Sequence, residues 1–471
     1  MSLLVPDFLI LILAFGIFAL DLLKVPAKVL WNVAWLSLTG IFVLLNTLPA
    51  GMSHEWMGAW ELNNLGLLLR EFFVFSALVV TLLTRRYFFA NNAQLKRLPE
   101  FLFALLVVTF GSIVVVSAKE LLTLFVGLEL ATIPLYFLVA WNKRCSLSGE
   151  ASTKYILIGS ASTAMMLFGL SYLYGFTGSL NFDVIKSQLS TQPLDNLFWT
   201  SAIFIIVGIG FKLALFPFHA WAPDVYEGAP TPVTAFLSVS SKATAIAFLT
   251  ILLYGPLAPI HKDLDFLLLL LAAVTMLVGN LGALRQSRLK RFMAWSSIAQ
   301  AGYILTALVG PANIAKPAIV FYLFVYAFSN YLMFWIISIL ESTRPTTFSS
   351  LQGLAKQYPA LGAALAVTLF SLAGIPPVAG FIGKLFLFGS AANAGYYVFI
   401  IYAALNSTIS LYYYLQVMRA AYVTPGSENP QALAITGFDK GVSLILTLLV
   451  LLAGFAPWLS NNIHTILQTG P

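Results

Sequence analysis

Residues 210–219, GFKLALFPFH, decide the fold of this chain because they place a lysine and a proline within one apolar segment. The lysine is Lys212 and the proline is Pro217, and the whole apolar segment covers residues 196–219. Proline removes a helical hydrogen bond and frees carbonyl groups that lipid cannot satisfy. Such a break persists in a membrane-spanning helix where it lines a cavity that water enters. The stretch therefore predicts a broken membrane-spanning helix that carries a buried base.

A second apolar segment is interrupted in the same way. Residues 373–384, AGIPPVAGFIGK, combine Pro376 and Pro377 with Lys384. Transporters place such breaks at corresponding positions of two repeats. The two breaks lie five predicted segments apart, which indicates two five-helix repeats, and because five is odd the repeats are inverted relative to each other. An ordinary proline kink is the alternative for either break taken alone.

The composition of the whole chain is that of a polytopic membrane protein. Of its 471 residues, 60% are hydrophobic and 9% are charged, whereas soluble domains carry about 25% charged residues. A single cysteine, Cys145, excludes a disulfide framework and any cysteine-based metal or iron–sulfur site. The sequence contains no phosphate-binding glycine loop, no dinucleotide fingerprint and no Cys/His metal cluster. We therefore expect an all-α membrane protein without a redox centre or a metal site of its own.

Hydropathy, read against proline, glycine and charge, predicts about 14 membrane-spanning segments that each approach the required length of about 20 residues. Their expected limits are 3–23, 29–48, 65–84, 101–117, 121–141, 152–175, 196–219, 232–254, 265–284, 292–310, 317–340, 359–390, 395–418 and 441–460. We expect an N-terminal three-helix segment, two five-helix repeats and a C-terminal helix, at residues 1–100, 101–260, 261–425 and 426–471. The first segment is as long as the others and lacks a basic leader, so it does not resemble a cleaved signal peptide.

Basic residues are distributed unequally between the predicted loops. Loops after odd-numbered segments hold 16 of the 25 lysines and arginines, whereas loops after even-numbered segments hold four: Lys119, Lys186, Lys262 and Lys316. Because cytoplasmic loops are enriched in lysine and arginine, the odd-numbered loops are expected in the cytoplasm. Both termini are then expected on the periplasmic side of a bacterial inner (plasma) membrane, and an even number of segments agrees with that.

The remaining five basic residues fall within predicted segments: Arg70, Lys154, Lys212, Lys242 and Lys384. Arg70 lies near a segment end, where its long side chain is expected to reach the interface. A central lysine costs about 2.5–3.5 kcal/mol on insertion, so four would cost on the order of 10 kcal/mol without compensation. Glu129 is the one acid expected well inside a segment, which indicates either water in the bundle or lysines that are neutral at rest. The alternative is that the lysines bind carbonyls or lipid headgroups and only hold helices together.

Polar side chains accompany the lysines. Hydroxyl and amide groups can hold water in a chain between titrating groups, although packing between helices is their alternative role. The residues expected to support such a chain are Ser238, Ser241, Gln300 and Tyr303. His219 follows the first break near the expected cytoplasmic end, where it either packs against its neighbours or admits protons.

Four further stretches of the sequence are distinctive: residues 210–242 with the loop WAPDVYEGAP at 221–230, KRFMAWSS at 290–297, SLAGIPP at 371–377 and LYYYL at 411–415. They resemble the antiporter-like membrane subunits of respiratory complex I, NADH:quinone oxidoreductase, and among them the N type (subunit N, or subunit 2 in organelles). Lys384 argues against the M type, which usually has a glutamate there. The chain is also too short to carry the long lateral helix of the L type. The resemblance covers most of predicted segments four to thirteen.

The resemblance implies a 14-helix fold with two inverted five-helix repeats, and it implies roles for particular residues. Glu129 and Lys212 are expected to interact, with Lys154 and Lys242 continuing a proton relay towards Lys384. The family often has a histidine in segment ten where this chain has Gln300. Glutamine conducts protons through water but does not titrate near neutrality.

The resemblance also implies a function and partners. The chain would be a non-redox subunit of an enzyme that couples quinone reduction to proton pumping across the membrane. Other membrane subunits, of the M type and the small K, J and A types, and membrane lipid would be its partners, and no nucleic acid is expected. NADH, FMN, iron–sulfur clusters and quinone would all bind partner subunits. The alternatives are a subunit of an Mrp-type cation/proton antiporter, the equivalent subunit of a ferredoxin-dependent or photosynthetic relative, and a structural helix bundle.

Overall fold

The computed structural model describes residues 4–49, 51, 54–90, 92–425 and 432–468. The described chain is helical almost throughout, so the predicted all-α polytopic fold class is confirmed. Among the described residues, 13 helical segments are long and apolar enough to cross a membrane. The predicted segment at 359–390 is absent from that set because two helices of 15 residues each replace it.

The chain divides into two compact units. Unit 1 comprises Met1–Trp221, Gly228–Phe266 and Thr465–Pro471, and unit 2 comprises Ala222–Glu227 and Leu267–His464. The predicted division into an N-terminal segment, two five-helix repeats and a C-terminal helix stays a prediction. The inverted relation of the repeats stays a prediction.

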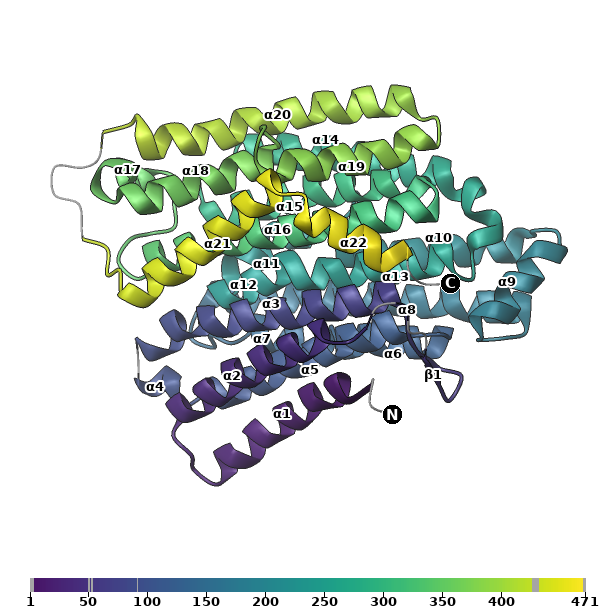
Figure 1. Ribbon diagram of the computed structural model, residues 1–471, viewed down its shortest axis with the longest axis horizontal. Helices are drawn as coiled ribbons and strands as arrows, with labels where there is room; N and C mark the ends of the chain where they lie inside the picture. Colours follow the sequence, from purple (N-terminus) through teal and green to yellow (C-terminus); the bar gives the residue numbers. More distant parts are fainter. Residues whose placement is uncertain (1–3, 50, 52–53, 91, 426–431, 469–471) are drawn as a thin grey trace. The chain divides into compact units, whose positions relative to one another are not determined.

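Unit 1 contains the N-terminal helices, a small hairpin and the first predicted repeat (Figure 1). Its elements are α1 (Val5–Leu22), α2 (Ala27–Asn46), β1 (His54–Trp56), β2 (Trp60–Leu62), α3 (Asn64–Phe89), α4 (Asn92–Leu95), α5 (Leu98–Ser117), α6 (Leu121–Leu130), α7 (Ile133–Val139), α8 (Ser146–Thr177), α9 (Phe182–Thr191), α10 (Asn196–Leu213), α12 (Thr231–Phe236), the π-helical turn η2 (Leu237–Ser241), α13 (Lys242–Tyr254) and the 3-10 helix η3 (Ala258–Leu264).

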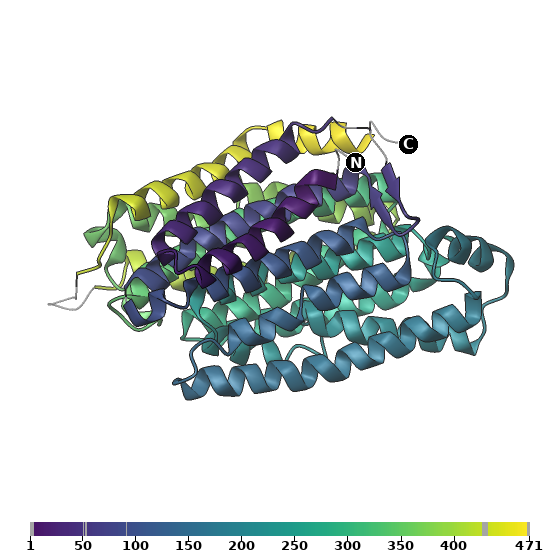
Figure 2. The ribbon, with the colours of Figure 1, turned by 90° about the horizontal axis from the view of Figure 1, so that it is seen from below.

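Within unit 1, α5 packs against α1, α3, α6 and α13, and α8 packs along α10. The purple helices α1 and α2 lie side by side in both views (Figure 1 and Figure 2). Their outer faces are apolar and exposed; the side chain of Ile12 is 64% exposed and that of Phe15 is 56% exposed. An apolar surface of this kind is where a membrane protein meets lipid or another subunit.

The strands β1 and β2 form an antiparallel hairpin between α2 and α3, a feature that hydropathy did not predict. Lys119, in the short connection between α5 and α6, forms ion pairs with Glu55 of this hairpin and with Asp183 of α9. Its hydrogen bond to the Glu55 carboxylate raises the pKa of Lys119. Opposite charges thus hold together three connections at one end of unit 1.

Two contacts place the start of the first described helix and the end of the last on one side of unit 1. Asp7, near the start of α1, contacts Arg70, near the start of α3. The side-chain amide of Asn64, the first residue of α3, donates a 2.6 Å hydrogen bond to the carbonyl of Ile466. The even number of crossings stays a prediction. The side of the membrane that they share stays a prediction.

Unit 2 contains the second predicted repeat and most of the C-terminal helices. Its elements are α14 (Asp265–Leu284), which begins at the unit boundary, α15 (Leu289–Leu305), η4 (Thr306–Val309), α16 (Ala312–Glu341), η5 (Ser349–Leu351), α17 (Leu354–Gln357), α18 (Pro359–Ala373), α19 (Ala379–Asn393), α20 (Tyr397–Tyr422), α21 (Gly437–Phe455) and α22 (Trp458–Gln468), whose last residues belong to unit 1. α16 is buried along its span and packs against α18, α19 and α21. α18 and α19 follow each other beside α20 (Figure 1).

Three features correct the predicted course of the chain. The helix of the first break, α10, ends at Leu213, and the stretch read as a loop at 221–230 forms the helix α11 (Trp221–Gly228). The segment that carries Glu129 is itself broken, between α6 and α7, because Ala131 and Thr132 leave the helix ahead of Pro134. A π-helical turn, η2, interrupts the segment that carries Lys242. Each interruption therefore lies next to a predicted relay residue.

Candidate functional site

The two predicted breaks end their first helices alike. α10 ends in the left-handed residue Ala214, with φ 55°, and α18 ends in the left-handed residue Gly374, with φ 84°. A proline follows three positions after each, Pro217 and Pro377, and the peptide bond before each proline is cis. The helix ends leave carbonyl groups that the polar side chains described below can bind.

Lys212 lies in the last turn of α10 and its side chain is 3% exposed. Its Nζ lies 3.7 Å from Oε1 of Glu129 and donates a 2.7 Å hydrogen bond to the hydroxyl of Thr132. The Thr132 hydroxyl in turn donates to the carbonyl of Leu128, 2.6 Å away. Glu129 accepts a further hydrogen bond of 3.0 Å from Thr163 of α8. The structure thus brings together a base and an acid that are 83 positions apart in the sequence.

Close packing positions the break that carries Glu129. Gly111 of α5 lies against the backbone at Leu130 and Ala131, and a β-carbon at this glycine would come within 2.6 Å of the Leu130 carbonyl carbon. A larger residue at position 111 would therefore push the broken helix away from α5. Pro134 is the sequence signal for this break, because proline is tolerated in the first turn of a helix and interrupts its interior.

Lys154 differs from the other predicted relay lysines. It lies in α8, its side chain is 39% exposed, and it forms an ion pair of 2.6 Å with Glu150 one turn earlier. The expectation that this lysine is buried without an acid was wrong, because Glu150 lies on the same face of α8, four residues away. Its participation in a relay stays a prediction.

Lys242 is buried, with 5% of its surface exposed, and it is the first residue of α13 after the π-helical turn. Ser238 lies in that turn and donates to the carbonyl of Ala235, whereas Ser241 ends the turn and is partly exposed. Thr244 donates a 2.8 Å hydrogen bond to Ser112 of α5. π-helical turns occur frequently at functional sites. Polar groups therefore surround the start of α13 within unit 1.

In unit 2, Lys384 lies in α19 just beyond the second break and is 4% exposed. Its Nζ donates 2.9 Å hydrogen bonds to the carbonyl of Ala373 and to the hydroxyl of Ser407. It also lies 4.6 Å from the centre of the Tyr303 ring, a distance typical of a cation–π contact. Ala373 is the last residue of α18, and the break at Pro376 leaves its carbonyl without a helical partner. Lys384 binds this carbonyl.

Gln300 contacts the same helix end. Its amide donates 3.0 Å and 3.4 Å hydrogen bonds to the carbonyl of Leu372 and the hydroxyl of Tyr414, and it accepts one from Tyr322. Gln300 and Lys384 therefore bind adjacent carbonyls of α18. The sequence indicated both residues but assigned no role to Tyr322 or Tyr414.

The remaining two predicted residues are His219 and Arg70. His219 is partly exposed between α10 and α11, and its ring stacks on Phe216 with 5.6 Å between ring centres. Arg70 does not reach the interface as predicted. It is 1% exposed and its Nε lies 3.0 Å from Asp7, while Nη2 donates a 2.6 Å hydrogen bond to Ser117. The sequence could not pair Arg70 with Asp7, because 63 positions separate them.

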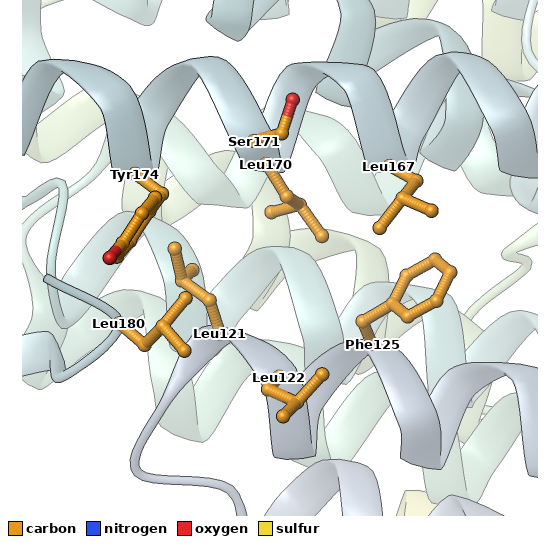
Figure 3. A pocket seen from close by; sticks show the side chains of 8 residues that line it. All are labelled: Leu121, Leu122, Phe125, Leu167, Leu170, Ser171, Tyr174 and Leu180. Atoms are coloured by element: carbon orange, nitrogen blue, oxygen red, sulfur yellow. The ribbon is translucent and has the colours of Figure 1, made fainter.

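An apolar groove of about 280 Å³ lies between α6 and α8 (Figure 3). Leucines and Phe125 line it from both helices, and the Ser171 hydroxyl points away from the groove. Its lining contains no charged side chain, so it is not a relay site. Within the described ranges, no group of three or more His, Cys, Asp or Glu residues is arranged to hold a metal ion.

Comparisons with known proteins are consistent across the chain. Residues 118–410 match the family model described as NADH:quinone oxidoreductase/Mrp antiporter, TM. The chain is 35% identical to NAD(P)H-quinone oxidoreductase subunit 2 of Nostoc sp., over 98% of this chain and 91% of the relative. It is 34% identical to NADH-quinone oxidoreductase subunit N of Desulfitobacterium hafniense, over 97% of this chain and 96% of the relative.

Chains of solved structures are also similar to this one. A chain of respiratory complex I from Thermus thermophilus is 31% identical and superposes with a TM-score of 0.81 over 96% of this chain and 97% of that chain. A chain of the Mrp complex from Dietzia sp. superposes with a TM-score of 0.86 over 98% of this chain and 97% of that chain. The identity to the latter is 20%, so this likeness concerns the fold alone.

Proposed function

This chain belongs to the NADH:quinone oxidoreductase/Mrp antiporter membrane family, and from that premise we propose that it is the N-type, proton-translocating subunit of an NADH:quinone oxidoreductase. It contains no redox site of its own and couples quinone reduction on other subunits to proton movement through buried side chains. The observation that carries the proposal is the Glu129–Lys212 pair of unit 1, 3.7 Å apart at two helix breaks, with the lysine side chain 3% exposed and the glutamate side chain 17% exposed.

The pair is suited to control a proton. Two unit charges about 4 Å apart attract each other by about 4 kcal/mol at an effective dielectric constant of about 20. Doubling their separation removes about half of that attraction, which corresponds to more than a tenfold loss of proton affinity at the lysine. Charge rearrangement during quinone reduction separates Glu129 from Lys212, and Lys212 then releases its proton.

The released proton passes by way of Lys242 to Lys384, and Lys212 reloads from the cytoplasm through the side of His219. Hydroxyl and amide groups, among them Ser238, Ser241, Gln300 and Tyr303, hold the water that connects these lysines. Lys154 is a further member of the relay. Because it is paired with Glu150, burying its positive charge costs less free energy than burying that of Lys212, Lys242 or Lys384.

The proposed function implies a membrane location and partner subunits for this chain. It lies in the inner membrane of a bacterium as a multi-pass subunit, with both termini in the periplasm. The M-type subunit and the small K, J and A-type subunits contact its exposed apolar faces, and lipid covers the rest. NADH, FMN, the iron–sulfur clusters and quinone bind to other subunits of the assembly.

Purification of the tagged chain from its native membrane tests the assignment against the Mrp alternative. We expect flavin and iron–sulfur absorbance to co-purify with the chain, together with NADH:quinone turnover. Purification with cation/proton antiport activity and without those chromophores would identify an Mrp-type antiporter. An electron-input module that accepts ferredoxin in place of NADH would identify the ferredoxin-dependent or photosynthetic relative.

Removing the Thr132 hydroxyl tests the geometry of the pair. Valine has the shape of threonine but cannot accept the 2.7 Å hydrogen bond from Lys212. A hydrogen bond to a charged group contributes about 1.5–3 kcal/mol, so we expect Thr132→Val to lower proton pumping by about tenfold or more. The control is Thr109→Val, whose buried hydroxyl bonds to the carbonyl of Leu105 of its own helix. Equal pumping rates in the two variants would contradict the role of Thr132.

A further inference from the structure

The helix α11 links the two units. Its first residue, Trp221, and its last, Gly228, belong to unit 1, whereas residues 222–227 belong to unit 2. The chain therefore leaves unit 1 immediately after the first break, forms less than two helical turns within unit 2, and returns. Its ends are about 12 Å apart, because an α-helix rises by about 1.5 Å per residue, and backbone hydrogen bonds join successive turns.

Basic residues at the start of α15 hold the acidic face of α11. Nη1 of Arg291 lies 2.7 Å from Oδ1 of Asp224 and 3.0 Å from Oε2 of Glu227. Arg288 forms a second ion pair with Glu227. The two acids are three residues apart and so lie on one face of α11. One guanidinium nitrogen thus contacts both carboxylates.

Trp221, at the other end of α11, packs under the helix end that carries Lys212. Its ring nitrogen donates a 3.0 Å hydrogen bond to the carbonyl of Phe211, the neighbour of Lys212. Its ring lies 5.0 Å from the Phe211 ring and 4.8 Å from the Tyr155 ring. Tyr155 in turn contacts the Tyr136 ring of α7, 4.9 Å away. These aromatic rings adjoin both helix ends that form the Glu129–Lys212 pair.

We propose that Arg291 is a positioning residue, which holds α11 through Asp224 and Glu227 and thereby fixes Trp221 against the helix end that carries Lys212. This inference rests on the proposed proton-translocating function and adds a regulatory contact to it. Movement of α15 in the second repeat then changes the geometry of the charge pair in the first. The salt-bridged helix α11 thereby couples the two repeats.

The test is turnover and proton pumping of the intact complex that carries Arg291→Gln. Substitutions along a coupling path change the coupled activity by about two- to thirtyfold, and we expect a loss in that range. Arg291→Lys, which keeps the charge but lacks the planar guanidinium, should fall between the parent and Arg291→Gln. Exchanging the charges in Asp224→Arg/Arg291→Asp should recover part of the loss relative to Arg291→Asp alone.

Lys290→Gln is the matched control. Lys290 precedes Arg291 in α15 and forms a 2.8 Å ion pair with Glu341, which lies outside α11. We expect it to leave turnover per assembled complex unchanged. Equal losses in Lys290→Gln and Arg291→Gln, or no recovery on charge exchange, would overturn the inference. A Lys212→Ala variant run in parallel separates the outcomes, because full pumping by that variant would instead overturn the proposed function.

Discussion

Lys212→Ala is expected to abolish most proton pumping and most NADH:quinone turnover, with a fall of at least about tenfold in each. The substitution removes the only base that the structure places against Glu129, at 3.7 Å, among the described residues. Glu129 then keeps the hydrogen bond from Thr163. A threonine hydroxyl does not titrate, so it cannot replace the lysine as the group that takes up and releases a proton. Proton uptake and turnover are measured on the complex in sealed vesicles.

Lys212→Arg distinguishes titration from simple charge. Arginine keeps the positive charge but does not lose its proton at any physiological pH. We expect this variant to fail nearly as badly as Lys212→Ala. Full pumping by Lys212→Arg would remove the proton-release step from the mechanism. Lys186→Ala, which removes a lysine from the short helix α9, is the control and should pump normally.

Arg70→Met is expected to have the largest effect on stability. The substitution leaves the Asp7 carboxylate, which is 1% exposed, without its 3.0 Å ion-pair partner. Removing one partner of a buried pair costs about 3–5 kcal/mol, because the remaining charge is desolvated and uncompensated. The chain should therefore accumulate in the membrane at a much lower level, and the purified complex should denature at a lower temperature.

The double variant Asp7→Asn/Arg70→Met tests the cause of that loss. Removing both charges is often neutral where removing one is not. We expect the double variant to accumulate to a higher level than Arg70→Met alone, although the hydrogen bond from Arg70 to Ser117 is also lost. A double variant no better than the single one would mean that packing, rather than charge, accounts for the effect.

Features that depend on local composition could be predicted from the sequence. The lengths of the apolar stretches predicted the membrane-spanning segments. Pro217, Pro376 and Pro377 predicted two breaks, because a proline removes a hydrogen bond within the helix that contains it. The buried state of Lys212, Lys242 and Lys384 followed from their apolar neighbours. The expectation for Lys154 failed because it was based on segment limits, and Glu150 lies just outside the limit that hydropathy suggested.

Features that depend on distant contacts could not be predicted. Asp7 and Arg70 meet across 63 positions, and no periodicity connects them. The pairing of Glu129 with Lys212 came from the family resemblance rather than from spacing. The sequence predicts a loop in place of α11, because proline and glycine, here Pro223 and Gly228, are frequent in turns. In the structure Pro223 lies in the first turn of α11, where the missing N–H of proline costs no hydrogen bond.

The π-helical turn before Lys242 makes the backbone geometry of this segment as important as its side chains. A π turn accommodates one residue more than an α-helical turn, and successive residues of an α-helix are rotated by about 100° around its axis. If Leu237–Ser241 closed into regular α geometry at the same length, Lys242 would rotate relative to α12 by roughly the angle of one residue, about 100°. The π turn therefore sets the direction in which the Lys242 side chain leaves the helix.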